Sequence, residues 1–189
     1  MQQAPASGLT LILGPMYSKK TESLIEKHRL LSASQRVLAV KPSMDNRYAE
    51  AEIVSHSGQR IPALPVASLA ELGARGDWDV LLVDEGQFLP GLAEFCLATL
   101  RREPRGKQIY VAALSGDAYA EPWELVSRLL PLASSVLWLC AECGRCGAPA
   151  AYTARLHNGP KVQVGGAEQF WPACTLCFFA NLSQLKQDT

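Results

Sequence analysis

Two Cys-x-x-Cys pairs restrict the fold of this chain more than any other feature of its sequence. Cys143 and Cys146 form the first pair, Cys174 and Cys177 form the second, and 27 residues lie between the pairs. Four thiolates can hold one zinc ion tetrahedrally, and because such a site leaves no position for water its role is structural. A redox Cys-x-x-Cys or a set of incidental thiols is the alternative. We predict a zinc-binding module over residues 140–189, which lacks the apolar surface to fold without the metal.

The composition is that of a globular protein and disfavours two classes of partner. Hydrophobic residues make up 48% of the chain and charged residues 19%, which excludes a mainly disordered chain. The 18 basic residues balance 18 acidic ones, so no net charge attracts nucleic acid or an anionic membrane. The first residues lack the basic and apolar regions of a secretory signal, and no apolar run reaches the roughly 18 residues of a membrane span. We expect a cytoplasmic protein with neither nucleic acid nor membrane as a partner.

Residues 1–139 alternate between strand and helix patterns. The apolar run Leu9–Leu13 ends at Gly14, and Lys20–Leu31 then carries apolar residues at helical spacing. Three more buried strands and one more helix follow, at Val37–Val40, Val80–Val83, Ile109–Leu114 and Leu92–Leu100 respectively. This alternation predicts an α/β core in which helices cover both faces of a parallel sheet.

Two segments give weaker patterns. Between Met44 and Trp78 we expect a mixed loop with short strands at 53–55 and 60–63. In the zinc module we predict strands at 150–156 and 161–164, joined by a turn at Asn158 and Gly159 because Asn-Gly favours tight hairpin turns.

The segment from residue 14 to residue 21 lies between the first strand and the first helix, as a Walker A phosphate loop does. In such a loop the backbone N–H groups surround the phosphates, a lysine binds the β and γ phosphates, and a hydroxyl binds magnesium. Lys20 and Thr21 take the last two positions, which predicts a P-loop core of the RecA-like type. Lys19 stands where the pattern has glycine, and its side chain is expected to crowd the phosphates or the adjoining strand. A basic helix start after a tight turn is the alternative. The loop comprises Gly14, Pro15, Met16, Tyr17, Ser18, Lys19, Lys20 and Thr21.

Two acids end the apolar strand that precedes residue 84. In phosphoryl-transfer sites an acid at this place holds magnesium, directly or through water. We assign that role to Asp84, and we assign to Glu85 the role of the base that takes the proton from a substrate hydroxyl. A solvated pair of acids at a strand end is the alternative.

Several stretches together resemble the thymidine kinases that carry a zinc-bound lasso loop. They occur in the family's order over residues 9–178: 14–18, 41–48 (Lys-Pro-Ser-Met-Asp-Asn-Arg-Tyr), 84–88 (Asp-Glu-Gly-Gln-Phe), 151–153 (Ala-Tyr-Thr), and 164–167 with Phe170. The resemblance implies transfer of the γ-phosphoryl group of ATP to the 5′-hydroxyl of thymidine or deoxyuridine, with Mg²⁺. It also implies a structural Zn²⁺ and a homotetramer.

The resemblance further assigns residues to the two substrates. Glu85 matches the general base. The nucleotide and metal side would comprise the phosphate loop with Asp45, Arg47, Asp84 and Gln87. The nucleoside side would comprise Ala118, Tyr119, Lys161, Val162, Gln163, Val164, Gly165 and Phe170.

The chain departs from the family pattern at Lys19 and at three further positions. Ser115 stands where aspartate is usual, Ala118 where an aromatic residue packs beside the base, and Phe170 where tyrosine is common. Tyr119 can supply the ring that is missing at Ala118. Phe170 can take the place of tyrosine because stacking needs no hydroxyl. The alternative function is a catalytically impaired nucleotide- or nucleoside-binding relative with a regulatory role. A zinc-ribbon nucleic-acid module joined to an ATPase is disfavoured by the neutral charge.

Overall fold

The fold is built on one six-stranded parallel sheet. The computed structural model describes residues 5–45, 51–72, 77–162 and 165–187. The strands lie in the order β5-β2-β6-β7-β1-β8, and each hydrogen-bonded pair is parallel. The carboxyl ends of these strands therefore share one edge of the sheet. The strands are β1 (Gly8–Gly14), β2 (Val37–Pro42), β5 (Leu64–Val66), β6 (Val80–Val83), β7 (Gln108–Leu114) and β8 (Ser135–Trp138).

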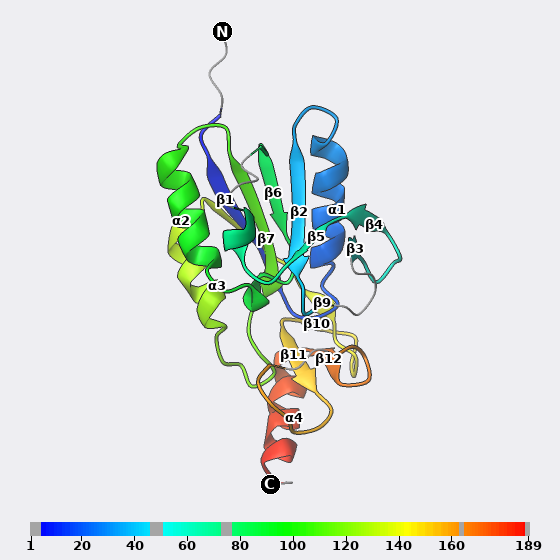
Figure 1. Cartoon of the computed structure of the whole chain (residues 1–189). Helices are drawn as coiled ribbons and strands as arrows, with labels where there is room; N and C mark the ends of the chain where they lie inside the picture. The colour runs from blue at the N-terminus through cyan, green and yellow to red at the C-terminus, as the bar shows by residue number, and fades with distance from the viewer. Residues whose placement is uncertain (1–4, 46–50, 73–76, 163–164, 188–189) are drawn as a thin grey trace.

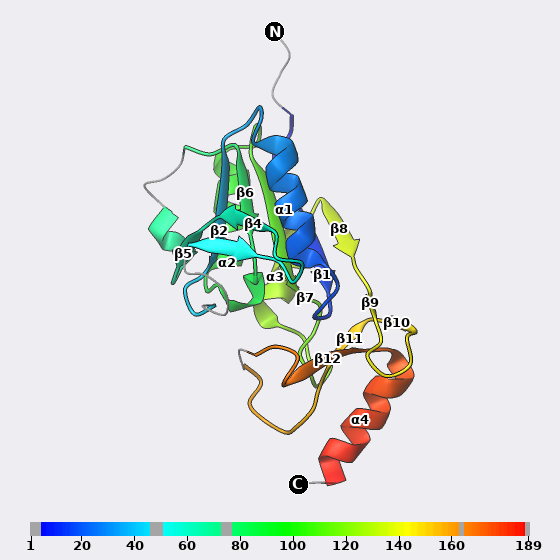
Figure 2. The same cartoon turned by 90° about the vertical axis from the view of Figure 1, so that its right-hand side faces the viewer.

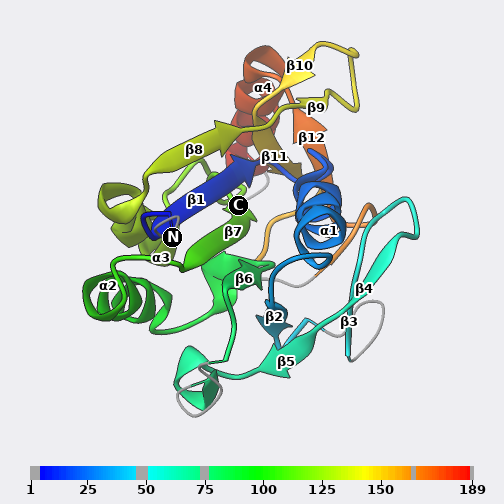
Figure 3. The ribbon, with the colours of Figure 1, turned by 90° about the horizontal axis from the view of Figure 1, so that it is seen from above.

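Helices cover both faces of the sheet because alternate side chains of each strand enter two separate cores. Leu9, Leu11 and Leu13 of β1 pack with α2 (Leu92–Arg102) and α3 (Glu124–Leu129), whereas Ile12 packs on the opposite face with α1 (Lys20–Leu31). Figure 3 shows α1 on one side of the sheet and α2 and α3 on the other. The predicted fold class, a parallel sheet with helices on both faces, is confirmed.

Two sheet-edge strands were not predicted, although both contain apolar residues. β5 contains Pro65 and lies at one edge, where a strand can tolerate the missing N–H. β8 lies at the other edge, and its Leu137 and Trp138 are largely exposed. The short strands expected at 53–55 and 60–63 are present as the antiparallel pair β3 (Glu52–Val54) and β4 (Arg60–Pro62).

A small C-terminal unit follows the sheet, and the division between residues 139 and 140 stays a prediction. Its one compact core consists of Ala154, Ala173 and Phe178, with Tyr152 and Trp171 packed around it. Figures 1 and 2 show this unit at the carboxyl edge of the sheet. The unit contains β9 (Ala141–Glu142), β10 (Pro149–Ala150), β11 (Tyr152–Arg155), β12 (Phe170–Ala173) and α4 (Thr175–Gln187).

The hairpin predicted within this unit is wrong. β11 pairs antiparallel with β12, and the described residues Lys161 and Val162 are not in a strand. The pairing with β12 buries Ala154 and Ala173 against Phe178, whereas Val162 remains half exposed. The Asn-Gly turn signal is local, and the burial obtained by the more distant strand outweighs it.

Candidate active site

The phosphate loop connects β1 to α1 with a tight backbone. A Cβ at Gly14 would lie 2.5 Å from the carbonyl oxygen of Leu139 and 2.5 Å from Ser18 Oγ, so only glycine fits there. Tyr17 and Lys19 adopt left-handed conformations, with φ of 66° and 64°. The Lys19 side chain is exposed, so the cost of replacing the usual glycine lies in the backbone conformation and not in crowding of the adjoining strand.

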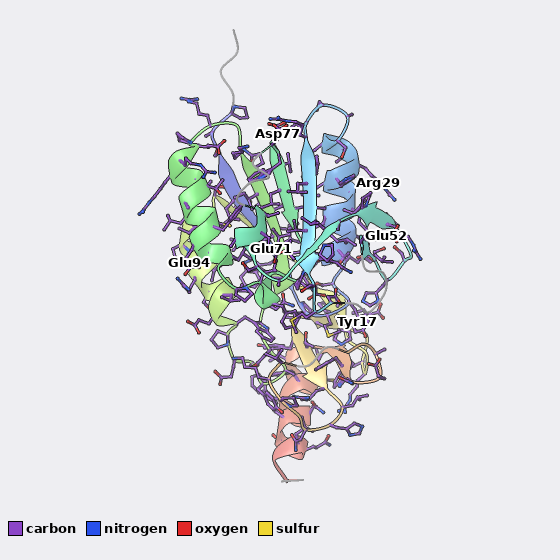
Figure 4. The ribbon with its side chains drawn as sticks, in the orientation of Figure 1. Tyr17, Arg29, Glu52, Glu71, Asp77 and Glu94 are labelled. Atoms are coloured by element: carbon purple, nitrogen blue, oxygen red, sulfur yellow. The ribbon has the colours of Figure 1, made fainter. Side chains whose placement is uncertain are left out.

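The polar groups of this loop are turned toward its own backbone. Ser18 Oγ donates a hydrogen bond to the Pro15 carbonyl at 2.8 Å, and Lys20 Nζ donates to the same carbonyl at 2.6 Å. Met16 N–H donates to Thr153 Oγ1 of β11 at 2.9 Å. Figure 4 shows Tyr17 at the end of the core that faces the C-terminal unit. The loop is thus attached to both parts of the chain.

The structure brings the hydroxyl and the acids of the predicted metal site together. Thr21 Oγ1 donates to Asp84 Oδ2 at 3.2 Å, although 63 residues separate the two. Burial raises the pKa of Asp84 to about 7, helped by the negative charges of Glu85 and Asp45 and opposed by Lys20. The side chains of Thr21, Asp45, Asp84 and Glu85 line one cavity, together with those of Lys41 and His56.

Such a cluster of hard oxygen donors fits Mg²⁺. Burial and neighbouring acids disfavour the ionised form of a carboxyl group. A divalent cation that binds beside the group makes the ionised form more favourable. Mg²⁺ in phosphoryl-transfer sites is held by one or two carboxylates, a hydroxyl and phosphate oxygens. Thr21 and Asp84 are the residues that would hold it.

Glu85 is positioned by a relay of two hydrogen bonds. The Leu114 N–H at the end of β7 donates to Gln87 Oε1 at 3.1 Å, and Gln87 Nε2 donates to Glu85 Oε2 at 2.5 Å. Glu85 itself has a φ of 50°, and a Cβ at Gly86 would lie 2.5 Å from Val111 Cγ1. Gln87, which was predicted on the nucleotide and metal side, therefore contacts the predicted base in this structure.

The four cysteines of the two pairs form one cluster. Their sulfur atoms all lie within 4.8 Å of one another. Cys146 Sγ is 3.6 Å from Cys174 Sγ and 3.8 Å from Cys177 Sγ. Tetrahedral zinc with bonds of about 2.3 Å would separate its sulfurs by about 3.8 Å, whereas a disulfide would bring them to about 2 Å. The donor set and its spacing fit zinc.

Backbone donors favour the thiolate form at Cys143, which is buried. Burial alone would raise the pKa of this thiol, but hydrogen bonds from the backbone N–H groups of Cys174, Arg145 and Cys146 lower it to about 6. A thiolate is the form that binds metal.

The described residues predicted on the nucleoside side lie in loops and at the start of β12. Ala118 and Phe170 are buried, and Tyr119 Oη donates to the Gly159 carbonyl at 2.9 Å. Lys161 Nζ donates to the Pro122 carbonyl at 3.1 Å. Val162 is half exposed and Gly165 is partly buried. Arg47, Gln163 and Val164 lie outside the described residues.

Sequence reasoning missed three polar residues that organise this region. Arg155 is 3% exposed and contacts both loops; Asp117 is also buried, and Thr153 accepts the hydrogen bond from the phosphate loop. Thr153 belongs to a stretch that resembles the family, but no role was assigned to it. A charged residue within the small-residue run of β11 was the available signal for Arg155.

The fold and this site together define a P-loop nucleotide-binding protein with an attached four-thiolate metal module. The family model described as "Thymidine kinase" matches residues 7–178. The chain belongs to the thymidine kinase family, which confirms the resemblance and the predicted class of ATP-dependent phosphotransferase.

Two relatives illustrate the extent of the similarity. "Thymidine kinase, cytosolic" from Homo sapiens is 36% identical over 178 residues, which are 93% of this chain and 74% of the human protein. "Thymidine kinase" from Yaba monkey tumor virus is 36% identical over 172 residues, which are 89% of this chain and 93% of the viral protein.

A solved structure shares only a weak similarity. The cytoplasmic domain of the Thermomonospora curvata type VII secretion ATPase EccC matches 88% of this chain and 23% of its own, with 16% identity and a TM-score of 0.40. A similarity at this level supports no argument about function. Within the described parts of the chain, no helix combines the length and the apolar character needed to cross a membrane.

Proposed function

We propose that this chain transfers the γ-phosphoryl group of ATP to the 5′-hydroxyl of thymidine or deoxyuridine. The observation that carries the proposal is the placement of Glu85, hydrogen-bonded to Gln87 and sharing a cavity with Asp84 and Thr21 beside the phosphate loop. Membership of the thymidine kinase family supports the choice of nucleoside.

The proposed chemistry divides among a few residues. The backbone of residues 14–20 surrounds the phosphates, and Lys20 Nζ exchanges the Pro15 carbonyl for phosphate oxygens. Thr21 and Asp84 would hold Mg²⁺, which when bound would neutralise the phosphate charge; the family resemblance assigns Asp45 and Arg47 to the same side of the site. Glu85 accepts the proton of the nucleoside 5′-hydroxyl while the 5′-oxygen forms the bond to the γ-phosphorus. The bond to the β–γ bridging oxygen breaks, and ADP leaves.

The C-terminal unit is proposed to hold the nucleoside. The family resemblance assigns residues 161–165, Phe170 and Tyr119 to that side, and the cysteine cluster would hold Zn²⁺ to fix the unit. A cytosolic location and a homotetramer are proposed by similarity. The name of the human relative supports the location.

The exchange of Glu85 for glutamine tests the assignment of the base. Glu85→Gln keeps the size and the hydrogen bonding of the side chain but cannot accept a proton. We expect kcat for thymidine to fall by roughly 10²- to 10⁴-fold, the usual contribution of general base catalysis, with thymidine binding retained. An unchanged kcat would show that another group takes the proton. Tight binding of thymidine by the natural chain without any turnover would favour the impaired relative.

A further inference from the structure

A set of contacts fastens two loops of the nucleoside side to each other. The first loop, residues 117–123, follows β7, and the second loop, residues 156–162, follows β11. Arg155 Nη1 donates to the carbonyls of Gly159 at 2.7 Å and Pro160 at 3.1 Å, and to Tyr119 Oη at 3.0 Å. Tyr119 Oη in turn donates to the Gly159 carbonyl at 2.9 Å. We name these contacts of Arg155 and Tyr119 the clasp.

The burial of Arg155 makes the clasp specific to one loop conformation. Its side chain is 3% exposed. A guanidinium cannot lose its charge in a protein, so its burial is favoured where acceptors meet its N–H groups, as they do at Arg155 Nη1. The carbonyls of Gly159 and Pro160 provide such partners only while the second loop lies against Tyr119. Opening of this loop would remove these bonds.

The clasp touches the positions expected to meet the base. The Arg155 guanidinium lies 5.3 Å from the centroid of the Tyr119 ring and 5.7 Å from that of Phe170. It therefore lies close to both aromatic rings, and Tyr119 directly follows the buried Ala118, the position at which the family usually has an aromatic residue. Arg155 acts on the nucleoside through these rings.

A second fastening supports the first. The Asp117 carboxylate, whose side chain is 2% exposed, accepts hydrogen bonds from the N–H groups of Tyr119 at 2.9 Å and Glu121 at 2.8 Å. It also pairs with Lys161 Nζ at 3.5 Å, and Lys161 Nζ donates to the Pro122 carbonyl. The first loop is thus held in shape where it meets the second.

We propose that Arg155 and the Tyr119 hydroxyl are positioning groups that hold residues 156–162 in the nucleoside-binding arrangement before the nucleoside arrives. The proposal rests on the nucleoside kinase function proposed above. A loop that is ordered in advance costs less to order on binding, so the clasp should increase affinity for the nucleoside and leave the chemical step and the ATP side unchanged. In this chain the clasp offsets the loss of an aromatic side chain at Ala118.

Tyr119→Phe is the matched test, because it removes the hydroxyl and keeps the ring. The change removes the hydrogen bond from the buried Arg155 and the one to the Gly159 carbonyl, so we expect KM and Kd for thymidine to rise roughly 3- to 10-fold. We expect kcat to change less than about 2-fold, with KM for ATP unchanged. Arg155→Lys, which keeps the charge but loses the planar fork, should act in the same direction and more strongly. Tyr110→Phe on β7 is the control and should change none of these values.

Hydrogen exchange of the ligand-free protein gives a second readout that does not need turnover. Amides of residues 156–162 should exchange faster in Tyr119→Phe than in the natural chain, and saturating thymidine should remove the difference. If exchange in this loop and the Kd for thymidine were both unchanged in Tyr119→Phe, the proposed positioning role would be wrong. An equal fall of kcat with all substrates would also contradict it. If the natural chain phosphorylated no nucleoside, the proposed function would fail, while the exchange difference would still decide whether the clasp orders the loop.

Discussion

Replacement of Lys19 by glycine should stabilise the protein. Lys19 immediately precedes α1 with a φ of 64°, a left-handed conformation, and its side chain is exposed. The left-handed conformation costs a residue with a Cβ roughly 1–2 kcal/mol, and glycine avoids this cost. Glycine in turn adds freedom to the unfolded chain, which costs about 0.4–1 kcal/mol. The net gain should be about 0.5–1 kcal/mol, or about 1–4 °C in Tm for a protein of this size.

Lys19→Ala is the control that isolates the backbone effect. It removes the same charge and side chain but keeps the Cβ, so it should leave Tm within about 1 °C of the natural chain. Thermal unfolding of the zinc-loaded proteins, followed by circular dichroism in low and high salt, measures both variants. If Lys19→Ala were stabilised as much as Lys19→Gly, relief of backbone strain would not be the cause. The reasoning would also fail if the glycine variant were no more stable than the natural chain.

Three further predictions concern the acids, the relay and the metal cluster. Gln87→Leu removes the relay, so Glu85 is no longer oriented, and kcat should fall roughly 10- to 100-fold with little change in KM for ATP. Steady-state kinetics measure this effect, and an unchanged kcat would contradict the prediction. The folded-state pKa of Asp84, about 7, lies above its unfolded value of 3.8, so ionisation destabilises the magnesium-free native state increasingly as pH rises from about 4 to 7. Asp84→Asn should therefore match the natural chain in free energy of unfolding near pH 4 and exceed it above pH 7 by up to about 4 kcal/mol. Urea unfolding without magnesium measures this difference, and a difference independent of pH would contradict the raised pKa of Asp84. Cys146→Ser should reduce bound zinc and weaken thymidine binding more than ATP binding, measured by metal analysis and calorimetry, whereas full zinc retention would exclude Cys146 as a ligand.

The core could be predicted from the sequence where burial and local pattern agree. The helix Lys20–Leu31 and the strand Val80–Val83 match their predicted bounds. Leu24 and Ile25 of the helix are fully buried, and so is each residue of the strand. In both elements the apolar residues that form the pattern are the residues that make the core. β8 was not predicted, and it differs from these elements because its apolar Leu137 and Trp138 are exposed at the sheet edge and add little to the core.

The arrangement of the C-terminal unit and of the clasp depends on contacts between distant residues. The Asn158-Gly159 signal predicted a hairpin that the pairing of β11 with β12 overrides. Arg155 meets Tyr119 across 36 residues, and no local pattern marks either residue as a partner of the other. The cysteine cluster was predictable, in contrast, because the spacing within each pair is itself the signal for a shared metal.

The central claim is tested most directly by product analysis of the zinc-loaded natural chain with labelled ATP, Mg²⁺, and thymidine or deoxyuridine. The account predicts that the γ-phosphoryl label appears on the 5′-oxygen of the nucleoside and that ADP forms in equal amount. ATP hydrolysis without a labelled nucleoside, or thymidine binding with no transfer, would contradict it.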